Sequence, residues 1–592
     1  MTQARTRPVF SRAALVRRTA AAVFSFLVGL WCTRKVAHGQ RAVPGADSSF
    51  QAVATPKTAG LEIIRQGANS EKLGGEPTLG GTLRLFLRQP DLSDLNPAAF
   101  RHDFQLTVSY LDPLVWLDPE SLEPGPWLAE SWEWSPDGMR ISYVLRADVL
   151  WHDGELLTAD DVAFSLTVYR DDLDSAVRNF FVLMDSIEVT GSHTLTVNLA
   201  APDGGWVLNA SSQPIFQRRQ YLEQWESRPV GQRTLHGFDW STSLPVGTGP
   251  WEIRDLETDR VNLRRNPLYW AGPANADQLE LRVETDGAAR LSAWVRGEVD
   301  LLWPVVAADV RQVSNLPGEL YVADGLDVMF AAFNFQNPLR PAPGVFADLR
   351  LRQALTLAVD RRGYAEELFD GYIDELAAGT IAQPWASDPS MTSPRRNVAE
   401  AKRLLAEIGW EDRNGDGLVE DFNGFPLSLQ LIVRNDAAAE FLAVLERLVD
   451  DLAEIGVGLA VRRLNPDVFR ERWVFGHDFD LIAYSYTLYP GFTDFDLYGS
   501  LWDIRINPQG WNPGGYSNSI VDTAIDEALF SVDLDIQRAA LQTLRRVTNE
   551  DLFGLWLGFP QELTLVRPDI HGFRPHTVWQ TWDSRLLWRS PS

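Results

Sequence analysis

The sequence predicts an α/β protein with at least two lobes, and two features carry this prediction. The chain has 592 residues, which at about 100–200 residues per domain is enough for several domains. Strand and helix patterns alternate along it, most clearly as a strand at 427–433, a helix at 438–455 and a strand at 457–463. Such a unit implies two parallel strands joined by a right-handed crossover.

Other strands are expected where apolar and polar residues alternate, or where a short apolar run is bounded by turn residues. These stretches are 82–88, 141–146, 194–199, 251–256, 260–264, 279–285, 299–302 and 479–486. The pair at 251–256 and 260–264 should form a hairpin, because only a short polar segment separates them.

Helices are expected where a capping residue precedes an apolar stripe. Thr158 is followed three residues later by Asp161, which is the capping-box pattern. Asn397 begins another helix, and a helix over 288–296 should end at Gly297, since glycine favours the C-terminal end. A further helix is predicted after Asp348.

Charge argues against two classes of partner. The chain carries 54 Lys and Arg against 80 Asp and Glu, a formal net charge of −26. Such a surface repels nucleic-acid phosphates and anionic lipids, so we expect neither as a partner. The 22 Trp, 13 Tyr and 29 Phe suit the apolar walls of ligand clefts as well as an ordinary core.

The N-terminus has the layout of a secretory signal peptide over residues 1–39. Five Arg and no acid lie within 1–19, and an apolar run over 20–32 follows. The alternative is an uncleaved anchor, although the run is shorter than the ~20 residues that span a bilayer. Residues 40–79 are rich in small and polar residues and are expected to form a flexible linker. We therefore expect an exported protein, in the periplasm or at the cell surface.

Cys32 is the only cysteine, which excludes a disulfide bond within one chain. A lipid anchor on Cys32 has weak support, because Leu30 and Trp31 precede it where a lipoprotein signal has small residues.

A series of short motifs then follows in a fixed order along the chain. They are 128–133 (LAESWE), 135–138 (SPDG), 151–154 (WHDG), 157–162 (LTADDV), 247–251 (GTGPW), 265–270 (RNPLYW), 296–300 (RGEVD), 333–334 (FN), 350–360 (RLRQALTLAVD) and 515–518 (GYSN). Together they resemble the extracytoplasmic solute-binding proteins of bacterial ABC importers, family 5, the dipeptide, oligopeptide and nickel type. The resemblance covers roughly residues 80–575.

This resemblance implies a fold of the periplasmic-binding-protein type II, with two α/β lobes, an extra subdomain on lobe 1 and two hinge strands. It places the hinges near 322–332 and 555–566. Lobe 1 is then expected over 80–325, lobe 2 over 326–560, and a return to lobe 1 over 561–592.

The resemblance also implies a function. A monomer would capture a peptide or similar small polar solute by closing its lobes, and would deliver that solute to ABC permease subunits in the membrane. An oligosaccharide or other non-peptide cargo remains an alternative. A sensor that reports the ligand to a membrane receptor would share the fold.

No enzyme motif supports the other class of function that we considered, a secreted carbohydrate hydrolase. The sequence has no His-Glu-x-x-His, no Gly-x-Ser-x-Gly, no phosphate-binding Gly-x-x-x-x-Gly-Lys and no paired cysteines. We therefore expect no catalytic residue, no cofactor and no metal site. His152 is interpreted as a structural turn residue.

Residues 412–420 resemble the first part of a calcium loop, with acids at alternate positions and Gly417 at the sixth. The twelfth position is Asn423 rather than Glu, and a strand rather than a helix is expected to follow. An exposed turn is the preferred interpretation, and bound calcium is the alternative.

The stretch 484–502 is the most informative one for the ligand. In relatives that bind peptides, a carboxylate in this region pairs with the peptide ammonium. Here the resemblance places Gly491 at that position, with Asp494 or Asp496 as the substitutes. The dense aromatic residues nearby suit either sugar stacking or packing between lobes. The predicted ligand-binding residues are Asn96, Ser212, Phe333, Asn334, Trp385, Tyr484, Tyr486, Phe492, Asp494 and Trp502.

Overall fold

The structure is a computed structural model. It describes residues 60–65, 76–87, 92, 94–100, 104–240, 243–340, 344–374, 383–388, 391–392, 394–488, 490–491, 493–508, 510–576 and 583–591. The expected signal peptide and Cys32 lie outside these residues. Among the helices of the described part, none combines the length and the apolar character needed to cross a membrane.

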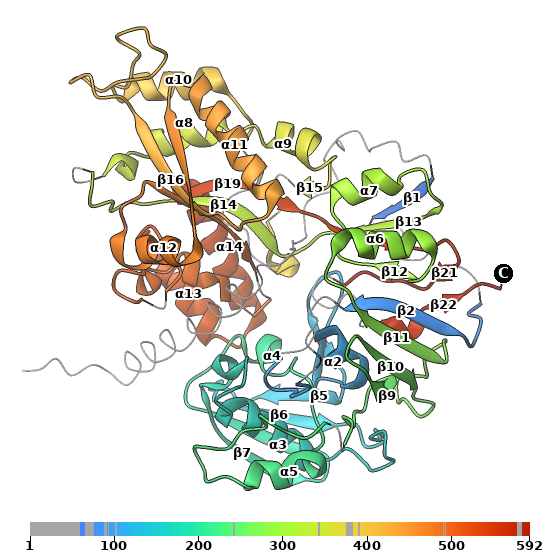
Figure 1. The fold of residues 1–592 in the computed structure, drawn as a ribbon. Helices are drawn as coiled ribbons and strands as arrows, with labels where there is room; N and C mark the ends of the chain where they lie inside the picture. Colours follow the sequence, from blue (N-terminus) through green and yellow to red (C-terminus); the bar gives the residue numbers. More distant parts are fainter. Residues whose placement is uncertain are drawn as a thin grey trace, which may run out of the picture.

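Three four-stranded sheets build the part of the molecule that we call the first lobe (Figure 1). The first sheet has the order β1 (Leu61–Arg65), β13 (Gly318–Ala323), β20 (Glu562–Val566), β12 (Leu301–Leu302). The second has the order β2 (Thr82–Leu87), β11 (Gln278–Val283), β10 (Arg260–Arg265), β9 (Trp251–Leu256). The third has the order β5 (Ala129–Trp134), β6 (Arg140–Leu145), β8 (Thr194–Leu199), β7 (Met184–Gly191).

One six-stranded sheet builds the second lobe, at the upper left of Figure 1. Its order is β15 (Ile373–Asp374), β19 (Gly554–Pro560), β14 (Asp327–Phe333), β18 (Leu481–Thr487), β16 (Ser428–Arg434), β17 (Gly458–Leu464). Strands β16 and β17 pair in parallel, with Leu431 opposite Val461. Helix α11 (Ala439–Glu454) connects them, which confirms the predicted strand–helix–strand unit.

Helices cover the sheets of both lobes (Figure 1). Those of the first lobe are α2 (Phe104–Tyr110), α3 (Ala159–Asp171), α4 (Trp206–Asn209), α5 (Arg218–Glu226), α6 (Gly287–Arg296) and α7 (Ala307–Val313). Those of the second lobe, besides α11, are α8 (Leu349–Ala358), α9 (Arg361–Leu368), α10 (Val398–Glu407), α12 (Pro466–Glu471), α13 (Ser519–Phe530) and α14 (Leu534–Asp551). Two small hairpins complete the first lobe: β3 (Val115–Leu117) with β4 (Pro124–Pro126), and β21 (Ile570–His571) with β22 (Trp588–Arg589).

The predicted helix ends are confirmed by their caps. The Thr158 backbone N–H donates to Asp161 Oδ2 at 3.0 Å, ahead of α3. The Asn397 side chain accepts from the backbone N–H of Glu400, ahead of α10. Gly297 ends α6 with φ at 75°, a left-handed conformation that glycine adopts at little cost.

Two expectations need correction. Residues 61–65 lie in the predicted linker but form strand β1, which pairs in parallel with β13. A strand of five residues whose partner lies about 250 positions away carries little local signal. The strand expected at 299–302 shortens to Leu301–Leu302, because the Asp300 carboxylate and N–H both bond to the backbone of Arg84 on β2.

The chain crosses between the lobes at two short segments. Residues 324–326 connect β13 of the first lobe to β14 of the second, and Gln561 alone connects β19 back to β20. Both crossings fall within the stretches where the resemblance implies hinge strands. Two adjacent connections that are this short and run in opposite directions leave rotation about them as the freest motion between the lobes.

Candidate ligand-binding site between the lobes

An apolar cluster spans the boundary between the lobes. Trp116, Leu117 and Leu208 of the first lobe belong to the same buried cluster as Tyr486 and Leu488 of the second. We call this boundary the lobe seam. It consists of these cluster residues and of the hydrogen bonds that Gly204 and Asn209 make to the second lobe. Solutes that bridge two lobes of a protein bind at such a boundary.

Three hydrogen bonds cross the lobe seam at the segment that leads into α4. The backbone N–H of Gly204 donates to Leu529 O at 2.7 Å, and Gln537 Nε2 donates to Gly204 O at 2.9 Å. Asn209 Nδ2 donates to Gly491 O at 2.8 Å. The first lobe therefore touches the C-terminal turn of α13, the first turn of α14 and the segment after β18.

Gly491 is the position where the resemblance places a ligand-binding carboxylate. Asn209, from the opposite lobe, packs its amide directly against this glycine, so that a Cβ at residue 491 would overlap the amide. In this arrangement of the lobes the position therefore has no room for a side chain. Phe492 lies outside the described residues, and so does the side chain of Asp494.

On the first-lobe side, Asp112 is the centre of a buried polar network. Its carboxylate accepts from Trp127 Nε1 at 2.8 Å, Thr248 Oγ1 at 2.8 Å, Tyr269 Oη at 2.9 Å and Trp270 Nε1 at 3.4 Å. The residue is only 3% exposed. Burial raises the pKa of Asp112, and the four hydrogen bonds oppose that rise.

The Asp112 network joins motifs that lie far apart in the sequence. Thr248 belongs to the motif at 247–251, and Tyr269 and Trp270 belong to the motif at 265–270. His152 adds a further connection, since its Nδ1 accepts from Gly247 N and its Nε2 donates to Gly249 O. These motifs are recognisable in the sequence, whereas Asp112 lies in none of them and was not predicted.

Indole rings extend from this network to the lobe seam. Trp127 lies between Trp270 and Trp116, with ring centroids 5.0 and 5.4 Å away. The Arg146 guanidinium lies 4.4 Å from the Trp270 ring, and His576 packs edge-on against Trp116. Burial lowers the pKa of His576 to about 4, so the ring is neutral at pH 7. These rings give the first lobe an aromatic wall.

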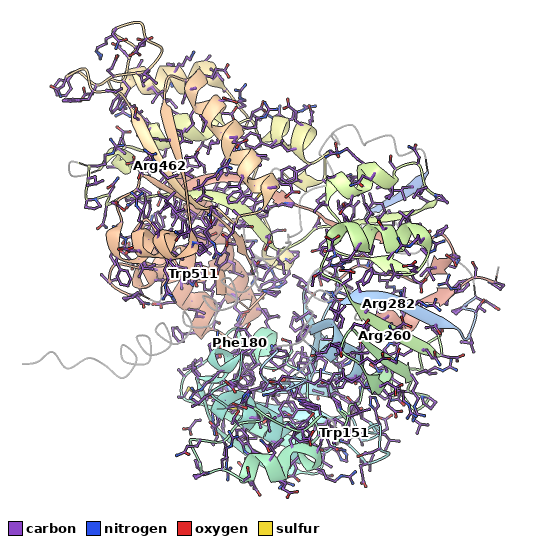
Figure 2. All side chains as sticks on the ribbon, in the orientation of Figure 1. Trp151, Phe180, Arg260, Arg282, Arg462 and Trp511 are labelled. Carbon is purple, nitrogen blue, oxygen red and sulfur yellow. The ribbon has the colours of Figure 1, made fainter. Side chains whose placement is uncertain are left out.

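The aromatic residues predicted around 484–502 form a matching cluster on the second lobe, where Figure 2 labels Trp511. Tyr484 is half-buried, and its ring lies 4.6 Å from Phe330 and 6.1 Å from Trp511. Tyr486 is buried and donates to Asp496 Oδ1 at 3.0 Å. Trp502 is buried, and its indole Nε1 has no hydrogen-bond partner among the described residues.

The other predicted ligand residues differ in their surroundings. Phe333 is fully buried against Phe346 in the core of the second lobe, because alternation along β14 turns it away from the lobe seam. Asn334 donates to the carbonyls of His477 and Phe479, so its amide holds a turn of the second lobe. Both side chains therefore pack inside the second lobe, and ligand contact by either one stays a prediction.

The Ser212 hydroxyl donates to Leu208 O at 2.6 Å at the end of α4. Asn96 is buried, and its Nδ2 has no hydrogen-bond partner among the described residues. Trp385 is half-buried, with Arg538 over its ring and its Nε1 equally unbonded in the described part. Ligand contact by these three residues likewise stays a prediction.

Two carboxyl groups near the lobe boundary were not predicted. Burial raises the pKa of Asp203, one residue before Gly204, to about 7. Burial likewise raises the pKa of Asp324, in the first crossing, to about 6, and nearby Arg65 opposes that rise. Only the fold reveals these groups, since acids are common throughout this sequence.

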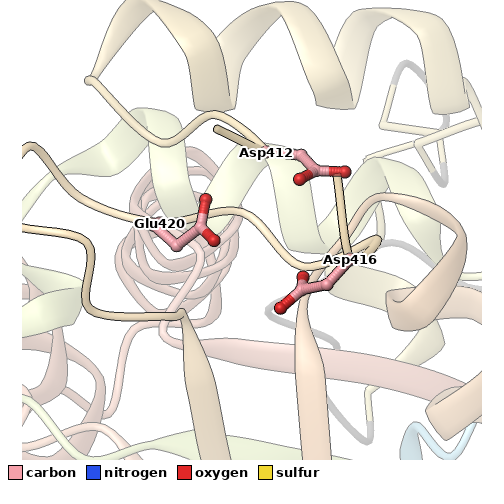
Figure 3. Close-up of side chains that lie close together, drawn as sticks. All are labelled: Asp412, Asp416 and Glu420. Atoms are coloured by element: carbon pink, nitrogen blue, oxygen red, sulfur yellow. The ribbon is translucent and has the colours of Figure 1, made fainter. Parts of the chain in front are cut away.

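The acidic turn at 412–420 lies on the second lobe, away from the lobe seam. Asp412, Asp416 and Glu420 place one carboxylate oxygen each within 4.8 Å of one another (Figure 3). Asp412 accepts from the N–H groups of Gly415 and Gly417, and Glu420 accepts from that of Arg413. The two aspartates are exposed but Glu420 is buried, so the turn is only partly the exposed one expected.

Comparisons with known proteins agree with this architecture. Residues 123–502 match the family described as bacterial extracellular solute-binding proteins, family 5, middle part. The oligopeptide-binding protein AppA of Bacillus subtilis is 23% identical over 541 residues, which cover 88% of this chain and 94% of AppA.

Solved structures show the same fold. AppA in complex with a nonapeptide superposes with a TM-score of 0.62 at 22% identity, over 87% of this chain and 100% of that one. NikZ from Campylobacter jejuni in complex with Ni(L-His) gives a TM-score of 0.66 at 21% identity, with the same coverage.

These matches confirm the predicted fold class and the prediction of a binding protein rather than an enzyme. The match over residues 123–502 covers most of the described chain and spans both lobes. The chain therefore belongs to the bacterial extracellular solute-binding proteins of family 5, the substrate-binding proteins of ABC importers.

Proposed function

We propose that this protein captures a peptide, or a polar solute of similar size, between its lobes and delivers it to membrane permease subunits. The observation that carries this proposal is the pair of short crossings at 324–326 and Gln561, which join two separately folded lobes. A solute that contacts both lobes stabilises the closed arrangement, because only that arrangement offers both sets of contacts.

For the two lobes we propose the residue ranges that the resemblance implies. Lobe 1 with its subdomain takes 80–325 together with strand β1 at 61–65, lobe 2 takes 326–560, and 561–592 returns to lobe 1. The subdomain sheet β5-β6-β8-β7 and the fold of β13 and β14 on either side of residues 324–326 support these ranges.

A peptide is the preferred cargo. AppA is similar over nearly its whole length, and its structure holds a nonapeptide. Extended peptides bind largely through backbone hydrogen bonds, so affinity does not require particular side chains on the protein. The half-buried Tyr484 and Trp385 and the buried Trp502 would supply apolar contacts to peptide side chains.

A non-peptide solute is the second candidate, and Gly491 favours it. The Asn209 amide occupies the space beside this glycine, so no carboxylate is available there for a peptide ammonium. The aromatic walls on both lobes would suit an oligosaccharide, and NikZ holds a small nickel complex. Asp494 or Asp496 would have to bind the ammonium if the cargo is a peptide.

The remaining parts of the proposal concern location and assembly. We infer export through the signal peptide at 1–39, with residence outside the cytoplasm as a monomer that docks on an ABC permease. Cleavage near residue 39 and a lipid on Cys32 are the two alternative ways of processing this N-terminus.

Native mass spectrometry of the protein purified from a bacterial host tests the cargo directly. The intact complex is weighed first, and the released solute is identified after denaturation. A ladder of peptide masses supports the peptide cargo, whereas a sugar or a metal complex supports the second candidate. Without a co-purified solute, thermal-shift panels of peptides and sugars take over. A complete panel without any shift would contradict capture of either class.

A further inference from the structure

Each lobe contributes one glycine to the lobe seam, and the other lobe forms a hydrogen bond with the backbone of that glycine. Gly204 of the first lobe lies against the α13–α14 loop, and Gly491 of the second lobe lies against Asn209. The two contacts are reciprocal, and both involve the segment that carries α4 (Figure 1).

At Gly491 the fit depends on the missing side chain. A Cβ there would overlap the Asn209 amide, which is only 3% exposed and donates to Gly491 O at 2.8 Å. The Asn209 Oδ1 has no hydrogen-bond partner among the described residues. The amide therefore cannot move aside without losing its one hydrogen bond across the lobe seam.

At Gly204 the obstacle to a side chain is backbone. A Cβ there would overlap the carbonyl oxygens of Ala528 and Ser531 and would lie 2.6 Å from Gln537 Nε2. Backbone atoms cannot rotate out of the way as a side chain can. The N–H and the C=O of Gly204 are both hydrogen-bonded to the second lobe, which fixes the separation.

Neither glycine is required by the conformation of its own lobe. Neither Gly204 nor Gly491 has a positive φ, so alanine is compatible with the local backbone at both positions. The groups that would collide at Gly204 belong wholly to the opposite lobe, and so does the amide at Gly491. A methyl group at either position thus opposes the contact between the lobes and not the folding of a lobe.

We propose that Gly204 and Gly491 determine lobe closure: each admits the opposite lobe into hydrogen-bonding contact, and a side chain at either one holds the lobes apart. This inference rests on the proposed function, in which closure accompanies binding. Because the apparent affinity scales with the population of the closed state, these residues set affinity without touching the solute.

Distances between spin labels on the two lobes test this inference without any ligand. The native cysteine is removed as Cys32→Ser, and labels are attached through Glu188→Cys on β7 and Asp450→Cys on α11, which are both exposed. The full chain is compared with Gly204→Ala, with Gly491→Ala and with the control Gly287→Ala. Gly287 begins α6, and a Cβ there meets no atom within 4 Å.

We expect a short-distance population in the parent and in Gly287→Ala, and about a tenfold loss of it in Gly204→Ala and Gly491→Ala. The double variant Asn209→Ala/Gly491→Ala removes the colliding amide and should regain the short distance. Damage to the fold would not be rescued in this way, and melting temperatures within about 1 °C of the parent would confirm intact lobes.

The inference would be overturned if the parent and all variants gave the same distance distribution. This includes the case in which the parent, too, shows only the long distance. So would a double variant that stays as open as Gly491→Ala. Failure of the proposed function is a separate result, since it would show as the absence of any bound peptide, sugar or metal complex in mass spectrometry, whatever the label distances are.

Discussion

Asp112, in the turn after α2, accepts a hydrogen bond from the indole N–H of Trp127 at 2.8 Å. Trp127 in turn packs against the apolar clusters of the first lobe and of the lobe seam. One buried carboxylate thus orients the ring that connects the core of the first lobe to the boundary with the second. The same carboxylate bonds to Thr248, Tyr269 and Trp270, so two of the family's motifs surround it.

Asp112→Asn should destabilise the first lobe by about 1–3 kcal/mol. The NH2 group of the new amide would face the N–H and O–H donors that the carboxylate accepts from, and the site is buried. Urea unfolding measures the loss. The matched control is Asp450→Asn, an exposed aspartate on α11, which should stay within about 0.5 kcal/mol of the parent. Equal stability of the two variants would contradict a central role for Asp112.

The pH dependence of stability should report on Asp203. Burial raises its pKa from 3.8 to about 7, so the folded chain holds a proton that the unfolded chain has released between these values. Asp203 therefore lowers the free energy of unfolding progressively as pH rises from about 4 to 7. Asp203→Asn removes this loss while keeping an acceptor for the N–H of Gly205.

The measurement is the melting temperature of Asp203→Asn relative to the parent, at pH 4.5 and at pH 8. We expect the melting temperature of Asp203→Asn minus that of the parent to be larger at pH 8 than at pH 4.5, by about 1 °C or more. Asp255→Asn, at an exposed position on β9, serves as control and should show no such trend. A difference independent of pH would show that Asp203 ionises normally.

A bound solute should stabilise the whole chain. A ligand that binds only the folded state contributes about 2.7 kcal/mol at a concentration of 100 times its dissociation constant. We expect a higher melting temperature with the identified solute, and a smaller rise in Gly204→Ala because closure is weakened. Differential scanning fluorimetry over a concentration series measures both. The same rise in both proteins would mean that affinity does not depend on the contact at Gly204.

We expect the acidic turn at 412–420 to be held by its own hydrogen bonds and not to bind a metal ion. Asp412 and Asp416 already accept hydrogen bonds from backbone N–H groups of the turn. Addition of millimolar calcium, or its removal with a chelator, should therefore change the melting temperature by less than about 1 °C. A larger rise that disappears in Asp416→Asn would instead establish a calcium site.

The sequence predicted elements whose signals are local. The capping pair Thr158–Asp161, the left-handed Gly297 and the parallel strands β16 and β17 all lie where the sequence placed them. Caps and apolar periodicity depend on residues a few positions apart, so they can be recognised in the sequence. Strand β1 was missed because its partner is distant and its pattern spans only five residues.

The predicted ligand positions differ in their surroundings, and ligand contact stays a prediction for all of them. Tyr486 and Trp502 lie in the cluster that spans the lobe boundary, whereas Phe333 belongs to the core and Asn334 and Ser212 bond to the backbone. Proximity along the chain to a hinge or a loop does not reveal which way a side chain points. Alternation along β14 decides that for Phe333.

The sequence by itself predicted an α/β protein from periodicity, caps and turn residues, which act over a few neighbouring positions, and the resemblance of its ordered motifs to family 5 implied the lobed fold and the binding function. Only the tertiary structure decided that two of those motifs converge on Asp112, that burial raises the pKa of Asp203 beside the lobe boundary, and that Gly204 and Gly491 face the opposite lobe. These relationships join residues more than 100 positions apart, and packing in space creates them.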